Sequence, residues 1–479
     1  MESRKAVSLR PLFQAVLTIC ALFVAALFVA ACSSMSGSVG NGMGSVSTMI
    51  SDPATCATPN GPFNSVWVTV TDVQANISSS AGPNDSGWVD LTPSLKKSPK
   101  QVNLLGIANN QCFLANLGDA QELQAGTYQQ IRVILASDST SISANNCGNG
   151  AANCVQLTSD MSFHTLNLSS EAQTGIKIPA GQIAKGGLTV QQGKTVDLDI
   201  DFMTCESIVQ EGNGQYRFKP VLHAGEVSTT SASMNGKVVD ANGPIDGAMI
   251  SLEQPNSTGT DIVVASAATG PDGAWVICPL VQGDPTKPYD VVITGVSPTG
   301  ALYAPAIVTG VTVGETVGTV TLNLPAGALA NYSSATLSGQ VGSNSPVAID
   351  VALSALESVN SVNYTIPLPI LTGQSSAYLS LETAAQSTQN PACASGTDCV
   401  NYQMVLPSSG AYIGAWAAAG ANLSQPAPLA TYVLDGEATS STSVGTADCS
   451  TSSMQQTVTL TGTGPFAPAV PTLAYSGCI

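Results

Sequence analysis

The sequence predicts an all-β fold built from tandem β-sandwich domains. Short runs alternate apolar and polar residues, as at 66–70, 131–135 and 458–461, and a period of two is typical of half-buried strands. Gly, Pro, Asn and Asp separate these runs and favour tight turns. Helical periodicity is almost absent beyond the N-terminal segment, and the mild helix candidates are 353–357 and 381–386. Many short strands with frequent turns indicate sandwiches or barrels.

The first 31 residues read as an export signal, with three basic residues ahead of an apolar run from Ala15 to Ala31. The run ends in Val29-Ala30-Ala31-Cys32, which resembles the lipobox of bacterial lipoproteins. This resemblance implies that Cys32 is lipidated on its thiol and amine and becomes the first mature residue. Ser33 at the second mature position then favours the outer membrane. An ordinary secretory signal or an uncleaved anchor is the alternative.

Composition narrows the classes of partner. The chain has 479 residues, of which 14 are Lys or Arg and 31 are Asp or Glu, for a net charge of −17. Removal of residues 1–31 leaves 11 cations and 30 acids, or −19. Nucleic-acid binding requires cations that neutralise phosphates, so it is disfavoured. Binding to anionic headgroups through protein charge is disfavoured for the same reason.

Ten cysteines remain once Cys20 in the signal and Cys32 are set aside, and an even number in an exported chain suggests disulfides. Three pairs close in sequence are predicted: Cys147–Cys154, Cys393–Cys399 and Cys449–Cys478. Three pairings stay open for the other four, which are Cys56, Cys112, Cys205 and Cys278. A thiol metal site is disfavoured, because the chain has no CxxC motif and two histidines.

The chain is too long for one ordinary core. After a flexible tether at 32–44, a first domain is predicted at 45–228. Segments of it, in order, are similar to the bacterial lipoprotein family known as domain of unknown function 4382: 65–73, 87–91, 102–105, 123–132, 173–178, 201–202, 207–209, 213–214 and 218–221. The resemblance implies a β domain. The cysteines of this region, Cys56, Cys112, Cys147, Cys154 and Cys205, are departures from the family's pattern. The turn Gly212-Asn213-Gly214 independently predicts a hairpin between 207–210 and 216–221.

A second domain is predicted at 232–325. Its segments 235–240, 244–252, 269–276, 289–293 and 316–322 resemble the carboxypeptidase regulatory-like domain, a transthyretin-type β-sandwich. This resemblance implies a spacer or binding module without peptidase chemistry. The resemblance also allows carbohydrate binding, for which only Trp275 and Tyr289 could provide aromatic rings that stack on a sugar. Residues 332–479 have no nameable family, and their strand signals suggest one more β-sandwich.

One strand carries the sharpest chemical signal. Asp197, Asp199 and Asp201 alternate with apolar residues and therefore share one strand face. They are candidate calcium ligands, calcium being the one cofactor considered. The alternative, which we favour, is the solvent face of a half-buried strand.

No catalytic site is predicted. The chain has no Gly-x-Ser-x-Gly elbow, HExxH motif, P-loop or dinucleotide fingerprint. A hydrolase with a dispersed Ser-His-Asp site at His164 or His223 is one alternative. The favoured hypothesis is a non-enzymatic lipoprotein of the outer membrane, on its periplasmic or surface face, that binds a glycan or an envelope protein. A purely structural envelope spacer is the other alternative, and an exposed row of aromatic residues would distinguish the glycan binder from it.

Overall fold

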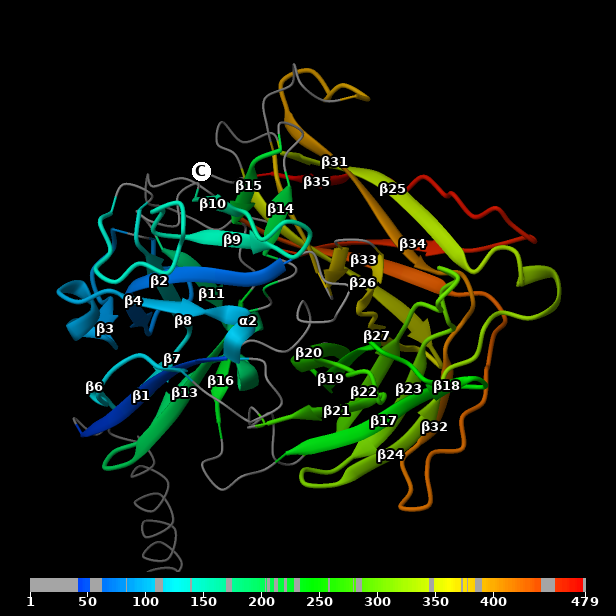
Figure 1. Cartoon of the computed structure of the whole chain (residues 1–479), viewed down its shortest axis with the longest axis horizontal. Helices are drawn as coiled ribbons and strands as arrows, with labels where there is room; N and C mark the ends of the chain where they lie inside the picture. The colour runs from blue at the N-terminus through cyan, green and yellow to red at the C-terminus, as the bar shows by residue number, and fades with distance from the viewer. Residues whose placement is uncertain are drawn as a thin grey trace, which may run out of the picture.

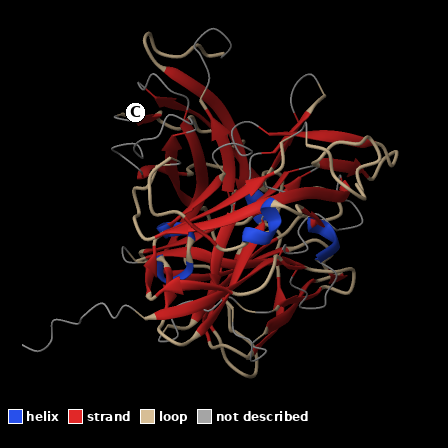
Figure 2. Cartoon of the chain, turned by 90° about the vertical axis from the view of Figure 1, so that its left-hand side faces the viewer, coloured by secondary structure: helices blue, strands red, loops and turns tan. Residues whose placement is uncertain are grey.

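Alternation of apolar and polar residues makes most of the chain extended, and the all-β sandwich prediction is confirmed (Figure 2). The computed structural model describes residues 42–51, 63–82, 84–107, 115–137, 140–168, 175–202, 204, 207–210, 214–218, 222–227, 233–256, 259–278, 280, 287–343, 349–371, 374–376, 378–383, 390–440 and 453–476. The helices in these ranges are single turns: α2 (Leu104–Ile107), η1 (Pro93–Lys96), η2 (Ala180–Gln182), η3 (Ala184–Gly186) and η4 (Gly327–Leu329).

The first region is a sandwich of two sheets around one apolar core (Figure 1, blue to green). One sheet has the order β16-β13-β1-β5, with β6 also on β1; its strands are β1 (Met43–Ser51), β5 (Ala115–Asn116), β6 (Gln121–Gln124), β13 (Thr195–Phe202) and β16 (Leu222–Glu226). The other has the order β11-β8-β2-β9-β10-β15-β14, with β3 and β4 on β2; its strands are β2 (Phe63–Asn76), β3 (Val89–Asp90), β4 (Lys100–Asn103), β8 (Gln130–Leu135), β9 (Cys154–Leu157), β10 (Phe163–Leu168), β11 (Ile176–Pro179), β14 (Ile208–Gln210) and β15 (Tyr216–Phe218). A short ladder joins β7 (Gly126–Tyr128) to β12 (Leu188–Val190). The predicted hairpin is confirmed, because β14 and β15 pair antiparallel.

The second region packs two sheets over its own core. One sheet contains β17 (Met234–Asp240), β18 (Gly243–Pro244), β21 (Ala274–Ile277) and β24 (Thr316–Thr321). The facing strands are β19 (Met249–Pro255), β20 (Thr260–Ala268), β22 (Tyr289–Thr294) and β23 (Ala306–Val311). The Pro271-Asp272-Gly273 turn requires glycine, since Gly273 has φ +75° and a Cβ there would lie 2.3 Å from the Val238 carbonyl oxygen.

The third region has a three-stranded sheet of β25 (Ser334–Ser343), β31 (Asp398–Pro407) and β35 (Leu473–Tyr475), and a small pair of β28 (Leu368–Leu371) and β29 (Gln374–Ser376). Its remaining strands are β26 (Ile349–Val359), β27 (Val362–Thr365), β30 (Tyr378–Glu382), β32 (Tyr412–Ala415), β33 (Thr431–Ser440) and β34 (Ser453–Thr459). The helix candidate at 353–357 was wrong, because those residues lie inside β26, where pairing with β33 overrides weak local preference. Residues 381 and 382 of the other candidate belong to β30.

The second and third regions share one large sheet. Its order is β32-β23-β22-β19-β20-β27-β26-β33-β34, with β30 on β26. Strand β32 pairs parallel with β23, and β27 pairs parallel with β20. The third region therefore supplies a strand to each edge of the second region's four strands, and the sheet crosses the predicted boundary at 325–332. The domain boundaries themselves stay predictions.

Candidate functional site

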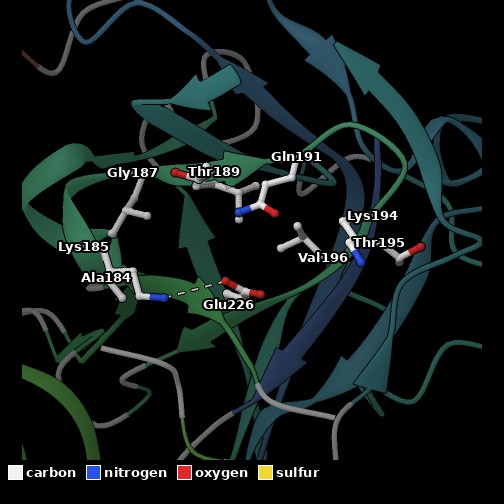
Figure 3. Close-up of a pocket in the computed structure, with 11 residues that line it drawn as sticks. Ala184, Lys185, Gly187, Thr189, Gln191, Lys194, Thr195, Val196 and Glu226 are labelled. Carbon is white, nitrogen blue, oxygen red and sulfur yellow. Dashed lines mark ion pairs between the residues drawn. The ribbon is translucent and has the colours of Figure 1, made fainter. Parts of the chain in front are cut away.

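A pocket of about 390 Å³ opens in the first region between the η3–β12 segment and strand β13 (Figure 3). Its apolar wall is formed by Ile183, Leu188 and Val196, each at most 3% exposed. These side chains belong to the core, so the wall is fixed by packing. Lys185 and Lys194 flank the pocket, with Glu226 below and Gln191 above in the view of Figure 3.

The pocket's charged groups give it a net positive charge. Lys185 Nζ lies 3.7 Å from Glu226 Oε2, and both side chains are about one-third exposed, at 34% and 39%. A long, hydrated ion pair of this kind contributes little to stability, so it opens readily. Lys194 forms no ion pair with any residue in the described ranges.

The backbone that presents the two lysines is held in defined turns. Lys185 has φ +65° and ψ +11°, a left-handed conformation that is costly for a residue with a Cβ. Lys194 ends a turn in which its N–H donates to the Gln191 carbonyl at 3.2 Å. Gly193 N–H in the same turn donates to the Met43 carbonyl of β1 at 2.8 Å. Both lysines therefore start from fixed backbone positions.

A larger cleft of about 670 Å³ shares Ile183, Ala184 and Lys185 with this pocket. Residues from all three regions line it, among them Lys185 and His223, Gln254 and Lys287, and Glu437. Burial lowers the pKa of His223 to about 4, so the imidazole is neutral at pH 7. Desolvation, aided by Asp435, raises the pKa of Glu437. Ligand sites are frequent where domains meet, which makes this cleft the second candidate site.

The aspartate face of β13 is not a solvent face, and that interpretation was wrong. Asp199 and Asp201 are 3% and 6% exposed, whereas Asp197 is half-buried. The same face of β1 carries Met49, paired with Asp199, and Met49 packs against the second region's core. The rest of the chain therefore covers this face, which period-two alternation cannot reveal.

Burial dominates the chemistry of Asp199. Desolvation raises its pKa to about 7, against the hydrogen bond that Ser51 Oγ donates to Oδ2 at 2.6 Å. Among the described residues, no group of three or more His, Cys, Asp or Glu side chains is placed to hold a metal ion. The calcium hypothesis for Asp197, Asp199 and Asp201 stays a prediction.

The hydrogen bonds at His164 do not have the direction of a catalytic pair. Ser162 Oγ donates its single proton to Asp160 Oδ1 at 2.6 Å, so His164 Nε2, 2.9 Å from the same oxygen, does not receive it. A catalytic triad needs the opposite direction, from serine to histidine. His223 faces Asp201 across β16 and β13, and Ser51 beside them donates to Asp199 Oδ2 at 2.6 Å and to Asp201 Oδ1 at 3.5 Å.

The expected sugar platforms lie in the core. Trp275 and Tyr289 are each 2% exposed, so neither ring can stack on a sugar. Trp88 is half-buried beneath the Arg132 guanidinium, 4.0 Å from the ring centroid. In the described ranges the one large aromatic side chain among the exposed hydrophobics is Tyr332. No exposed aromatic row is present there.

Three residues of the family-like segments, Asp72, Asp90 and Arg132, meet Gln74 and Lys96 in one polar network. Gln74 Nε2 donates to Asp72 and Asp90 at 2.6 Å each, while its Oε1 accepts from Arg132. Lys96 bridges Asp72 and Asp90 at 3.2 and 2.6 Å. The two carboxylates are offset by Lys96 and Arg132, so the network holds β2, β3 and β8 together.

Two of the predicted disulfides are present. Cys147–Cys154 and Cys393–Cys399 have S–S distances of 2.06 and 2.10 Å. Cys278 is also disulfide-bonded. The other cysteine predictions, including Cys32, Cys56, Cys112, Cys205, Cys449 and Cys478, lie outside the described residues. The described part of the chain contains no helix with the length and hydropathy of a membrane span.

The fold and its cavities define an all-β protein of three packed regions. Residues 43–220 match the family described as "Domain of unknown function (DUF4382)", which confirms that resemblance for the first region. The carboxypeptidase regulatory-like resemblance of residues 232–325 stays a prediction. No curated protein matches the chain.

Three solved structures show weak likeness. A leucine-rich repeat protein from Bacteroides thetaiotaomicron VPI-5482 has 9% identity and a TM-score of 0.19, over 52% of this chain and 27% of that one. A DUF3823 family protein from Bacteroides uniformis ATCC 8492 has 10% identity and a TM-score of 0.14, over 50% and 100%. A streptococcal ancillary pilin has 10% identity and a TM-score of 0.16, over 89% and 98%. At these TM-scores the likenesses assign no function.

The lysine pocket was missed by sequence reasoning. Lys185, Lys194 and Glu226 belong to no motif, and they lie in turns and at the end of an edge strand. The Lys185-Gly186-Gly187 run is a turn signal, but it does not show that a cavity lies beside the turn.

Proposed function

We propose that this chain is a non-catalytic component of the bacterial cell envelope, held at the outer membrane by a lipid on Cys32. Its second and third β regions act together as a rigid support. The observation that carries the proposal is the shared sheet, in which β32 and β27 complete both edges of the second region. Unpaired sheet edges invite aggregation or slippage, and pairing them removes that liability.

Buried hydrogen bonds fix the seam between the second and third regions. Glu253 Oε2 accepts from the Thr365 N–H at 2.9 Å, and Thr365 Oγ1 donates to the Asp261 carbonyl at 2.9 Å. Thr294 Oγ1 donates to the Pro367 carbonyl at 2.9 Å. Because all of these groups are buried or part-buried, separation of the regions would leave them without partners.

The other edge is fixed by Trp416. Its backbone N–H donates to the Thr309 carbonyl at 2.8 Å, and its indole Nε1 donates to the Thr316 carbonyl at 3.2 Å. The side chain also packs against the second region's core. These contacts support a single mechanical unit better than independent modules on linkers.

The buried positions of Trp275 and Tyr289 favour support over glycan adhesion through stacked rings. Ser162 and Ser51 donate their hydroxyl protons to the carboxylates of Asp160 and Asp199, and this favours a non-catalytic role. Adhesion through another surface is a second candidate, favoured by the lysine pocket.

Hydrogen exchange tests the rigid unit. Leu353→Ala removes a fully buried side chain of the third region, at an expected loss of about 2–5 kcal/mol. If the regions unfold together, exchange accelerates in β19–β22 as well as in β26. Val133→Ala in the first-region core is the matched control, because its effect is expected within that region. Acceleration confined to the third region would contradict the proposal.

The anchor has its own test. Full-length chain and Cys32→Ser are expressed in a Gram-negative host with radiolabelled palmitate, and the membranes are fractionated. We expect label and outer-membrane sedimentation for the parent and loss of both for Cys32→Ser. Equal labelling of the two would exclude Cys32 as the lipid site.

A further inference from the structure

We propose that the pocket flanked by Lys185 and Lys194 binds a hydroxyl-bearing monocarboxylate of monosaccharide size, the chemistry of a sugar acid. The site belongs to the first region alone and does not depend on the rigid-support function. Its volume of about 390 Å³ lies at the small end of ligand sites.

Charge selects the anion. Two lysines and one glutamate face the pocket, in a chain whose net charge is −17. Residues 288–479 contain no Lys or Arg, so cations are scarce overall and gathered in the first part of the chain. One excess positive charge matches a carboxylate better than a doubly charged phosphate.

The remaining lining groups suit hydroxyls rather than an apolar ligand. Gln191 directs an amide toward the space (Figure 3), and the rim carries Thr189 and Thr195, whose hydroxyls also pair with Thr127 and Ser45 at 3.3 and 2.8 Å. None of the 11 residues that line the pocket is aromatic. Recognition of a neutral sugar usually needs a ring to stack on, so charge and hydrogen bonds must supply the affinity here.

Two structural features indicate a prepared site. Lys185 keeps a left-handed conformation, with φ +65°, beside Gly186 at φ +75°, and a strained backbone at a non-glycine residue is common at functional sites. The Lys185–Glu226 pair, at 3.7 Å, is long and weak, so it leaves the ammonium group available to another anion. An incoming carboxylate can therefore replace Glu226 as the ion-pair partner of Lys185, while Lys194 contacts it from the opposite side of the pocket (Figure 3).

Calorimetric titration of the mature chain tests the proposal, with D-glucuronate, D-glucose, inorganic phosphate and trigalacturonate as probes. We expect glucuronate to bind about tenfold more tightly than glucose, in a salt-sensitive manner. Tighter binding of trigalacturonate would identify a polymer end as the source, and tighter binding of the monomer would identify a free acid. Equal binding of glucose, a preference for phosphate, or no saturable binding of either acid would overturn the proposal.

Variants locate the site. Lys185→Gln and Lys194→Gln should each weaken glucuronate binding about fivefold or more, whereas Lys97→Gln, an exposed lysine far along the chain, should not. Glu226→Gln should tighten binding, because it removes the competing carboxylate. A merely structural pair would give weaker binding in Glu226→Gln, and that result would overturn the assignment. Unchanged melting temperatures show that each variant is folded.

Discussion

Glu357 provides the most direct test of how the third region is held together. The side chain is 2% exposed, and its Oε1 accepts from the Ala411 N–H at 2.7 Å. Its Oε2 is buried and has no hydrogen-bond partner among the described residues. Tyr432, fully buried on the neighbouring strand β33, faces the same carboxyl group.

Burial raises the pKa of Glu357 from its ordinary value of 4.5 to about 8, although the hydrogen bond from Ala411 opposes the shift. The folded state therefore holds a proton that the unfolded state releases above about pH 4.5. Stability falls as the pH rises through this window and levels off above the folded-state pKa. At about 1.4 kcal/mol per pH unit, the loss between pH 4.5 and 8 is about 5 kcal/mol.

Glu357→Gln removes this titration while keeping an oxygen that accepts from Ala411. Its amide nitrogen becomes a buried donor without a partner, which costs about 1–3 kcal/mol at every pH. We expect the variant to be less stable than the parent at pH 5 and more stable by about 2–4 kcal/mol at pH 8.

Urea denaturation at pH 5, 6, 7 and 8 measures this difference. The buried carboxyls Asp199 and Asp261, whose pKa values burial raises to about 7, are present in both proteins and drop out of the comparison. Glu315→Gln, at the turn between β23 and β24, is the control and should stay parallel to the parent. A difference between Glu357→Gln and the parent that is constant from pH 5 to 8 would refute the reasoning.

Three further predictions concern the rest of the molecule. Gly273→Ala should lower the melting temperature and destabilise the second region by about 2 kcal/mol or more, because the new Cβ would meet the Val238 carbonyl at 2.3 Å; a neutral effect in calorimetry would count against the turn geometry. Cys147→Ser with Cys154→Ser should cost about 2–3 kcal/mol in urea denaturation, the range expected for a short loop, and a reductant should then no longer affect that region. Chelation with EDTA should leave the melting temperature unchanged, because Asp199 already accepts from Ser51; a chelator-sensitive transition that Asp201→Asn abolishes would instead support calcium at Asp197, Asp199 and Asp201.

Strand patterns predicted which residues share a face but not what covers it. The alternation along β13 places Val196, Leu198 and Ile200 in the first core, as the sequence indicates. The opposite face reads as polar, and a polar face usually meets water. Here β1 carries Met49 on that face, and packing against the second region buries Asp199 beside it. A local pattern cannot report a contact made by residues far along the chain.

The sequence could not predict the sheet that the second and third regions share, because its strand pairs also join residues far apart in the chain. Strand β32 is four residues long, and its partner β23 lies about a hundred positions earlier. Four residues such as Tyr412-Ile413-Gly414-Ala415 carry too little alternation to identify a partner or a register. The prediction of a third β-sandwich rested on the strand signals alone. Strands are present in that region, but tertiary packing decides which strands they pair with.

The polar network explains why the family resemblance indicates a fold more strongly than a function. Trp88, Asp90 and Arg132 stand in the segments that carry the resemblance, and each is engaged with another member of the network. The positions of these residues in the sequence are therefore determined by the pairing of β2 with β3 and β8. The pocket lysines face solvent and contribute little to the core, so the fold places weak demands on their identity. Binding specificity at Lys185 and Lys194 can thus change while the network, and the resemblance with it, stays the same.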